Sequence, residues 1–107
     1  MNVGFTAHPQ VAADLADLGS AALQREALGY MKRLRREPLL GRPLGKQALT
    51  GDLSDCRKIF FNGAEHRIVY RLLPDERKPQ EVYVIVVGPR AGLVVYKEAV
   101  RRLGRSQ

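Results

Sequence analysis

The sequence predicts a mixed α+β fold: a small, mainly antiparallel sheet with an N-terminal helical hairpin packed on one face and a short C-terminal helix. Three observations predict it. Apolar residues recur at helical spacing through residues 11–34. They alternate at strand spacing through much of residues 53–88, and an Asn-Gly pair at Asn62 separates two of these runs as a tight turn does. Since 107 residues suit one compact domain, we expect a single domain over residues 1–107.

The N-terminal third of the chain is expected to form a short strand and then two helices. Residues 2–7 read as the strand, and Pro9 stands where a helix commonly begins, because its missing N–H costs nothing in a first turn. Ser20 follows a glycine and is a candidate N-cap for the second helix, which runs to about Arg36 before Pro38 stops it. Two amphipathic helices joined by a tight turn make a helical hairpin.

The next segment, residues 37–52, is rich in proline and glycine and carries spaced leucines. Prolines and glycines interrupt regular structure, whereas leucines anchor a chain to a core. We therefore expect an ordered loop here, pinned by Leu39, Leu44 and Leu49.

The rest of the chain is expected to contain three strands and a helix. Residues 53–61 and 65–73 form a hairpin around the Asn-Gly turn, and residues 81–88 are apolar on both faces, as expected for a strand inside a sheet. Residues 94–107 suit a short helix with a basic end. The predicted order is β-α-α-β-β-β-α. So few helices can hardly cover both faces of a sheet, so the open face is a candidate groove for a partner.

Charge and composition narrow the class of protein. The net charge is +7: residues 1–31 carry −2, residues 32–58 carry +5 and residues 59–107 carry +4. A basic surface suits a polyanion such as nucleic acid, or an acidic protein.

The single cysteine, Cys56, excludes an internal disulfide and a cysteine-based zinc site. No apolar run approaches the roughly 18 residues of a membrane span, and the N-terminus lacks a signal-peptide pattern, so we expect no membrane partner and a cytoplasmic location.

Alternation along the hairpin gathers cations on one face of the sheet. Lys58 and Phe60 share a face of the first strand, and Arg67 and Arg71 share a face of the second. The alternate residues of the two strands are apolar or aromatic: Ile59, Phe61, Ile68 and Tyr70. If these residues face the helices, the face with the cations points away from the helices. Arg90 follows the neighbouring strand, within plausible reach, with Tyr96 six positions later.

This pattern suits a phosphodiester substrate. The sequence offers no paired carboxylates, no histidine pair at metal spacing, no nucleophile elbow and no phosphate-cradling glycine loop, so we expect neither a metal nor another cofactor. RNA can be cut at such a cationic site, because its own 2′-hydroxyl is the nucleophile. The protein then has to position that hydroxyl, stabilise charge on the phosphate and help the 5′ oxygen to leave.

Five segments in this order resemble one known family: FTAHPQVAADL, LTGDLSDCRKI, HRIVYRL, VYVIVVGPR and VYKEAVRRL. The chain resembles the RelE/ParE superfamily of toxins of type II toxin–antitoxin modules, and specifically the RelE-like mRNA endonucleases that act on the ribosome. The interval from Arg90 to Tyr96 is the most specific single feature of this resemblance.

The resemblance implies a role for each residue of the cluster. Lys58 would be the cation in the general-base position, and Arg67 would hold the scissile phosphate. Arg90 would act as the acid or stabilise the leaving group, and Tyr96 would stack on or orient the nucleotide. Further contacts to RNA are expected from Arg57, Phe60, Arg71, Lys97 and Arg101, whereas Arg102 and Arg105 are expected in a solvated basic tail with Arg101.

One position departs from the family pattern. Active members often carry a second lysine two residues after the first, and here Phe60 stands in that place. The change removes a charge where the transition state needs one. It is compatible with slower cleavage, with compensation by Arg57 or Arg71, or with a different target. A phenylalanine can also stack on a splayed base.

The resemblance implies a toxin that inhibits translation by cutting mRNA until its cognate antitoxin binds it in a hetero-oligomer. Its partners would be that antitoxin and the ribosome with bound mRNA, and the antitoxin would lie across the exposed sheet or replace the final helix. Two alternatives remain open from the residues: a ParE-like inhibitor of DNA gyrase, and a weakly active or inactive toxin-fold module that only binds.

Overall fold

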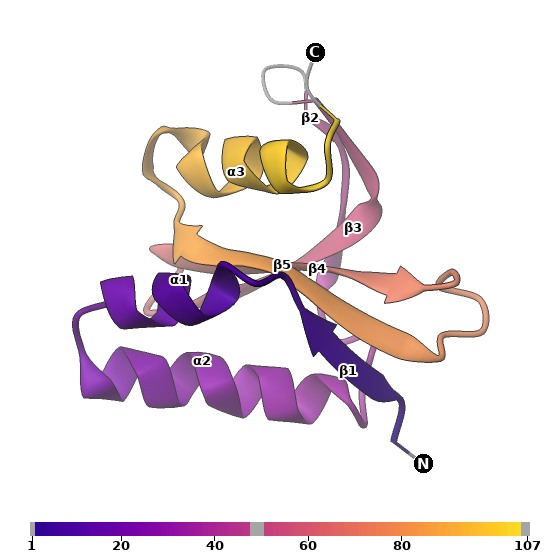
Figure 1. Cartoon of the computed structure of the whole chain (residues 1–107), viewed down its shortest axis with the longest axis horizontal. Helices are drawn as coiled ribbons and strands as arrows, with labels where there is room; N and C mark the ends of the chain where they lie inside the picture. The colour runs from indigo at the N-terminus through magenta and orange to yellow at the C-terminus, as the bar shows by residue number, and fades with distance from the viewer. Residues whose placement is uncertain (1, 48–50, 106–107) are drawn as a thin grey trace.

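The computed structural model describes residues 2–47 and 51–105 and confirms the mixed α+β fold (Figure 1). Leu49, one of the leucines expected to pin a loop, lies outside the described residues. No described helix is long and apolar enough to cross a membrane. The elements, in chain order, are β1 (Gly4–Ala7), α1 (Val11–Asp17), α2 (Ala21–Leu34), β2 (Arg42–Gln47), β3 (Gly51–Phe61), β4 (His66–Leu73), β5 (Glu81–Pro89), the 3-10 turn η1 (Ala91–Leu93) and α3 (Val94–Arg102).

The strands form one five-stranded sheet in the order β1-β5-β4-β3-β2. Neighbouring strands are antiparallel except for β1, which pairs in parallel with β5 at one edge. The parallel pair is possible because both helices of the hairpin and the strands β2, β3 and β4 lie between β1 and β5 in the chain, and parallel strands need a long connection. The predicted mainly antiparallel sheet is confirmed.

The helical hairpin covers one face of the sheet. The side chain of Ser20 accepts a hydrogen bond from the amide of Leu23 at 3.3 Å, which confirms Ser20 as the N-cap of α2. The buried face of α2 carries Ala27, Met31 and Leu34, which pack into one apolar core together with residues of β3, β4 and β5. The apolar residues that recur about every 3.6 positions in the sequence therefore form the stripe of α2 that is buried against the sheet.

The opposite face of the sheet is covered in part by α3, as Figure 1 shows. The expectation that one face stays open is therefore only partly right. Val95, Ala99 and Val100 of α3 are buried against a second core cluster that includes Val69 and Ile85. The helix docks there because its apolar stripe has no other surface to cover, and the sheet becomes the middle of three layers.

The predicted loop over residues 37–52 is wrong in its central part, because Arg42–Gln47 forms the edge strand β2. This strand pairs antiparallel with β3, and its register shifts between Pro43 and Gly45. Proline is tolerated at a sheet edge, where one side of the strand needs no ladder hydrogen bond. Gly45 has a φ of 70°, which suits the irregularity. The proline and glycine residues that indicated a loop are instead part of an edge strand.

Gly41 lets the chain enter β2 very close to the sheet. Its amide donates a hydrogen bond of 2.8 Å to the hydroxyl of Tyr70, which in turn donates to the carbonyl of Pro38 at 2.9 Å. Tyr70 is fully buried, so its hydroxyl would cost free energy without these partners. The two hydrogen bonds fix the segment that brings β2 beside β3.

Replacing Gly41 by alanine should lower the free energy of unfolding by about 1–3 kcal/mol, the usual cost of forcing extra atoms into a packed site. The added Cβ would lie 2.7 Å from the carbonyl oxygen of Lys58 and 2.8 Å from the ring of Tyr70. Gly29→Ala is the matched control: a Cβ there meets nothing within 4 Å, and alanine inside α2 should add about 0.5–1 kcal/mol. Urea unfolding measures both changes, and a Gly41→Ala protein as stable as the parent would contradict the packing argument.

Candidate functional site

The hairpin of β3 and β4 places three predicted site residues on one face of the sheet. Asn62 and Gly63 take φ angles of 53° and 60° at the turn, as a tight hairpin requires. The register then sets Phe60 opposite Arg67, and Lys58 opposite Val69. Residues directly opposite one another share a face, so Lys58, Phe60 and Arg67 project together on the side of α3. The predicted division of faces is confirmed, because the alternate residues lie in the core under the helical hairpin: Ile59, Phe61, Ile68 and Tyr70.

Arg67 is deeply buried, with 5% of its surface exposed. Its Nε donates to the hydroxyl of Tyr96 at 3.2 Å, and its Nη1 donates to the carbonyls of Ala64 and His66. These contacts come from α3 and from the hairpin turn, so two elements hold the guanidinium in place. Its Nη2 has no hydrogen-bond partner among the described residues, which leaves the two N–H donors of that nitrogen for a ligand.

Two cations lie close to the ring of Phe60. Its centroid is 3.9 Å from Cζ of Arg67 and 5.3 Å from Nζ of Lys58. Both distances suit cation–π contacts. Phe60 thus contacts the two neighbouring cations through its ring and adds no charge of its own.

Lys58 has a pKa below its usual value. Partial burial is the main cause, because it disfavours the charged ammonium, and the nearby charges of Arg67, Arg42 and Arg90 lower the pKa further. Its Nζ is 6.0 Å from the ring of Tyr96, and no carboxylate is paired with it among the described residues. A lysine in this state is neutral more often at a given pH, so it can accept a proton.

Arg90 and Arg42 are the two other cations whose charges act on Lys58. Arg90 directly follows β5; its amide donates to the carbonyl of Glu65 at 3.0 Å, and its side chain is exposed. Arg42 is the cross-strand partner of Lys58 and is also exposed. Arg42 was not among the predicted site residues, because no local pattern marks a cation in a segment that reads as a loop.

Tyr96 is brought to the cluster by α3 and is buried there. Only 5% of its surface is exposed, and its hydroxyl accepts the hydrogen bond from Arg67. A ring so deeply buried offers little surface for stacking on a base. In the structure its hydroxyl holds Arg67, whereas the contact to a nucleotide that the resemblance implies stays a prediction.

The cluster differs from the other partly buried cations of the described chain in having no anion. Elsewhere such arginines are paired, in the ion pairs Arg57–Glu76, Arg71–Asp55, Arg102–Asp14 and Arg105–Asp55. Lys58 and Arg67 are partly or fully buried and have no such partner in residues 2–47 and 51–105. Because burying a charge without a counter-charge is costly, this arrangement favours an anion supplied from outside the chain.

Two predicted RNA contacts are not brought into the cluster. Arg57 lies on the other face of β3, where it pairs with Glu76 at 3.0 Å and donates to the carbonyl of Gly41 at 2.5 Å. Arg71 is on the cluster's face, but it lies farther along β4 and pairs with Asp55 at 3.2 Å. Hydrogen bonding from Arg105, together with both arginine charges, lowers the pKa of Asp55 to about 2. The compensation expected from Arg57 or Arg71 therefore has no geometric basis.

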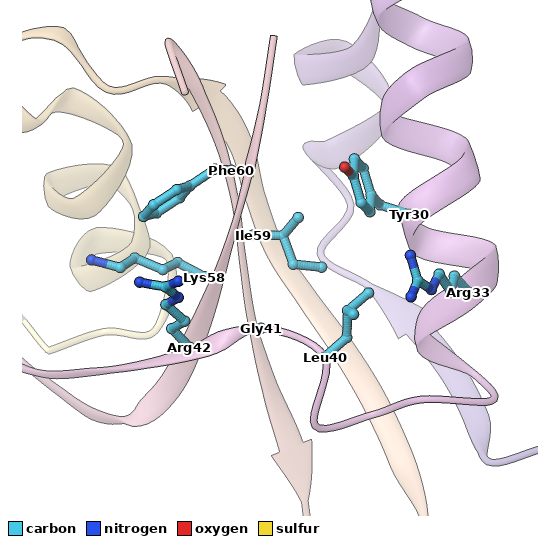
Figure 2. Close-up of a pocket in the computed structure, with 8 residues that line it drawn as sticks. All are labelled: Tyr30, Arg33, Leu40, Gly41, Arg42, Lys58, Ile59 and Phe60. Atoms are coloured by element: carbon cyan, nitrogen blue, oxygen red, sulfur yellow. The ribbon is translucent and has the colours of Figure 1, made fainter. Parts of the chain in front are cut away.

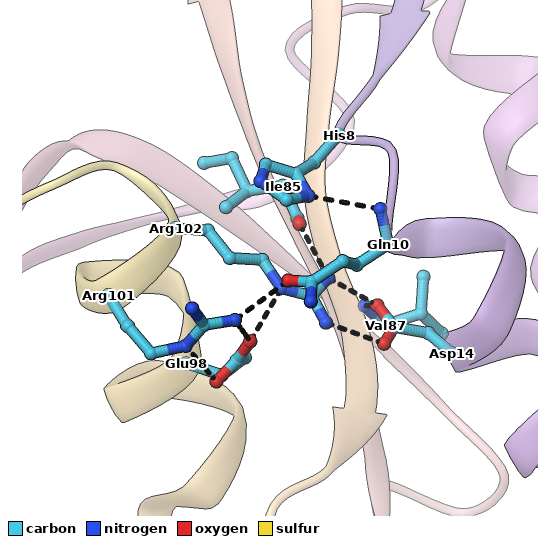
Figure 3. A network of polar contacts seen from close by, with 8 residues as sticks. All are labelled: His8, Gln10, Asp14, Ile85, Val87, Glu98, Arg101 and Arg102. Atoms are coloured by element: carbon cyan, nitrogen blue, oxygen red, sulfur yellow. Dashed lines mark hydrogen bonds and ion pairs between the residues drawn. The ribbon is translucent and has the colours of Figure 1, made fainter.

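The expected solvated basic tail is only partly right: Arg101 keeps 60% of its side chain exposed, whereas Arg102 and Arg105 form ion pairs with the folded structure. Arg102 keeps only 6% of its side chain exposed and pairs with Asp14 of α1 at 2.6 Å and with Glu98 at 2.7 Å (Figure 3). Arg101 hydrogen-bonds Glu98 and also Gln10, at 2.7 Å from the latter. These arginines lower the pKa of Glu98 to about 2. Lys97 is exposed on α3 and has no ion-pair partner among the described residues. The other basic residues of α3 and the tail are all paired with carboxylates.

One comparison with known proteins matches most of the chain. A family model described as the ParE toxin of the type II toxin–antitoxin system parDE matches residues 6–93. No curated protein matches the chain at a significant level.

Solved structures of toxins share the fold at low sequence identity. A free double arginine-to-alanine mutant of the Escherichia coli toxin RelE is 21% identical, with a TM-score of 0.68, covering 96% of this chain and 99% of that chain. The same mutant bound to a peptide of the antitoxin RelB is 22% identical, with a TM-score of 0.64 and coverages of 94% and 96%. The toxin–antitoxin complex RelBE2 of Mycobacterium tuberculosis is 20% identical, with a TM-score of 0.64 and coverages of 84% and 100%.

Proposed function

The chain belongs to the ParE family of toxins of type II toxin–antitoxin systems, within the RelE/ParE superfamily, and we propose that it is an endoribonuclease that cuts messenger RNA on the ribosome. The observation that carries the proposal is the set of cations around Lys58. Lys58 is partly buried and Arg67 fully buried, and neither is paired with a carboxylate in residues 2–47 and 51–105. A phosphate of a single-stranded RNA would supply the missing negative charge.

The site contains the groups that intramolecular cleavage of RNA requires. The neutral amine of Lys58 accepts the proton of the 2′-hydroxyl, and the resulting oxygen attacks the adjacent phosphorus. The bond from phosphorus to the 5′ oxygen then breaks, which leaves a 2′,3′-cyclic phosphate and a 5′-hydroxyl. Arg67, fixed by Tyr96, points its free Nη2 toward the phosphate and stabilises the extra negative charge of the transition state.

Arg90 stabilises the leaving oxygen as a charge and not as an acid. A guanidinium keeps its proton at any working pH, so it cannot donate one efficiently. Because Arg90 is exposed, the 5′ oxygen can take its proton from solvent at this side of the site. Of the two roles that the resemblance implied, this argument favours stabilisation.

Mapping RNA 5′ ends in a bacterial translation extract tests the proposal. The purified protein should produce new ends only in messages that ribosomes are translating, and Lys58→Ala and Arg90→Ala should lose them while keeping the parent's melting temperature. Arg77→Gln, an exposed arginine in the loop between β4 and β5, serves as a charge-matched control and should cut normally. Ends that persist in both site variants would show that cleavage occurs elsewhere.

The cleavage rate should rise with pH up to the pKa of Lys58, because only the neutral amine accepts a proton. Arg42→Gln removes one of the charges that lower this pKa. The pKa should therefore rise, so that less neutral amine exists at each pH and the rising part of the profile moves to higher pH. Single-turnover rates across the alkaline range measure this shift. Arg77→Gln should leave the profile in place, and a shift to lower pH in Arg42→Gln would contradict the assignment of the base.

Inhibition of DNA gyrase is the second candidate function, favoured by the match to the ParE family model and by Phe60 in place of a second lysine. A protein of this kind would bind without cutting RNA. Expression should then induce the DNA-damage response while messages stay intact, whereas the endonuclease should do the reverse. An inactive binding module would do neither and would not slow growth.

The proposed regulator is a cognate antitoxin that forms a hetero-oligomer with this chain, in line with two of the similar structures, which contain an antitoxin or its peptide. To silence the site, an antitoxin has to cover the cations around Lys58 or disturb α3, because Tyr96 of α3 orients Arg67. An acidic segment would offer the charge that this surface lacks.

A further inference from the structure

The edge of β3 is open next to the cation cluster. In the described part of the chain β2 pairs with β3 only as far as Arg42 opposite Lys58, and the chain then turns away at Gly41. Ile59 and Phe60 continue β3 beyond this point, and no strand of the described residues pairs with them on that side. A cavity of about 250 Å³ occupies the gap between this edge and α2 (Figure 2).

The cavity has an apolar end and a cationic end. Tyr30, Leu40 and Ile59 form the apolar end, between α2 and the sheet, as Figure 2 shows. Arg33 lines the same end, but its charge is already paired with Glu37 at 2.6 Å. Arg42 and Lys58 lie on the other side of β3, and neither has an ion-pair partner among the described residues.

This division suits a nucleotide better than an acidic side chain. An aromatic base needs a ring to stack on and apolar walls, which the end near Tyr30 offers, whereas its phosphate needs unpaired cations, which the end near Arg42 offers. An acidic side chain that entered the apolar end would not reach Arg42 and Lys58, which would stay unpaired. The volume is also below the roughly 300 Å³ at which pockets for drug-sized ligands begin, and so suits a single base.

We propose that this cavity binds the base of a nucleotide that flanks the cleaved bond, stacked on Tyr30, with the phosphate of that nucleotide held by Arg42. The inference rests on the proposed endonuclease function. Lys58 and Phe60 line both the cavity and the cation cluster, so an RNA strand can pass from one to the other without leaving the surface. The subsite fixes the position of the strand beside the reacting phosphate.

Ribosomes programmed with short synthetic messages test the subsite. One message is intact, and two others carry an abasic residue on either side of the cleaved bond. The parent protein should cut one of the abasic messages about fivefold or more slowly, since stacking of one base contributes about that much. Tyr30→Leu should cut the intact message equally slowly, and should lose nothing further on that abasic message.

Variants that preserve the fold keep this result interpretable. Tyr30 is half-buried and packs on the core, so leucine retains most of its apolar contact, and Tyr30→Phe, which keeps the ring, should restore the parent rate. Tyr83→Leu makes the same change at a half-buried tyrosine that packs with the cluster under α3, and should keep the full response to the abasic residue.

The outcomes separate the subsite from the function. Tyr30→Leu and the abasic residue could instead reduce the cleavage rate independently, so that the variant cuts each abasic message more slowly by the product of the two separate reductions. That result would overturn the subsite and leave the proposed endonuclease function intact. Tyr30→Leu cutting the intact message at the parent rate would do the same. Failure of the parent protein to cut any message, with Lys58→Ala equally inactive, would overturn the proposed function and the subsite together.

Discussion

Arg67→Gln should reduce the rate of messenger RNA cleavage by about 100-fold to 1,000-fold, the usual cost of removing a donor that stabilises charge in a transition state. The reason is that this guanidinium is fixed before the substrate arrives. Tyr96 and the hairpin turn hold Nε and Nη1, so the remaining Nη2 needs no reorganisation to meet a phosphate. Phe60, 3.9 Å away, supports the plane of the group from one side. Single-turnover cleavage on programmed ribosomes measures the loss.

Two further variants separate charge from geometry at this position. Arg67→Lys keeps the charge but loses the planar fork, so its rate should fall between those of the parent and Arg67→Gln. Arg77→Gln removes an equal charge from an exposed loop and should retain the parent rate. Melting temperatures show whether the fold is intact. If a well-folded Arg67→Gln protein cut at the parent rate, Arg67 would have no role in the reaction.

Asp14→Ala should lower the free energy of unfolding by about 3–5 kcal/mol, as breaking a buried ion pair from one side does. Asp14 keeps 11% of its side chain exposed and Arg102 keeps 6%, and the two are joined by hydrogen bonds of 2.6 and 2.7 Å (Figure 3). The same carboxylate also accepts a hydrogen bond from the amide of Val87 at 3.0 Å. Its loss would leave a buried cation with fewer partners and a strand amide with none.

Thermal unfolding measures this effect, and the melting temperature should fall by more than about 10 °C. Asp17→Ala is the matched control, since Asp17 lies on the same helix but is exposed, and it should change stability by no more than about 0.5 kcal/mol. Because the ion pair joins α1 to α3, Asp14→Ala should also loosen Tyr96 and slow cleavage. Equal melting temperatures for the two variants would mean that the pair contributes nothing.

Much of the candidate site could be predicted because it depends on local periodicity. Side chains alternate along a strand, so the grouping of Lys58 with Phe60, and of Arg67 with Arg71, follows from their numbers alone. The Asn-Gly turn fixes how the two strands face each other, and the register confirms that Phe60 lies opposite Arg67. These predictions did not require any knowledge of the rest of the fold.

The predictions that failed concern contacts between distant parts of the chain. β2 forms because β3 offers an edge, although its proline and glycines indicate a loop; strand preference depends on such neighbours. Arg42 was missed for the same reason. Arg102 was expected in a solvated tail, but its partner Asp14 lies 88 residues earlier in the chain, on another helix.

The sequence by itself determined the order of most of the elements, the face on which the catalytic candidates lie and the excess of positive charge, because each depends on spacing along the chain. Only the tertiary structure decided which cations stay unpaired. Arg57, Arg71 and Arg102 find carboxylates, whereas Lys58 and Arg67 have none among the residues that the structure describes. The physical reason is that a charge is satisfied by whatever folding brings within about 4 Å of it, and that neighbour can come from anywhere in the chain.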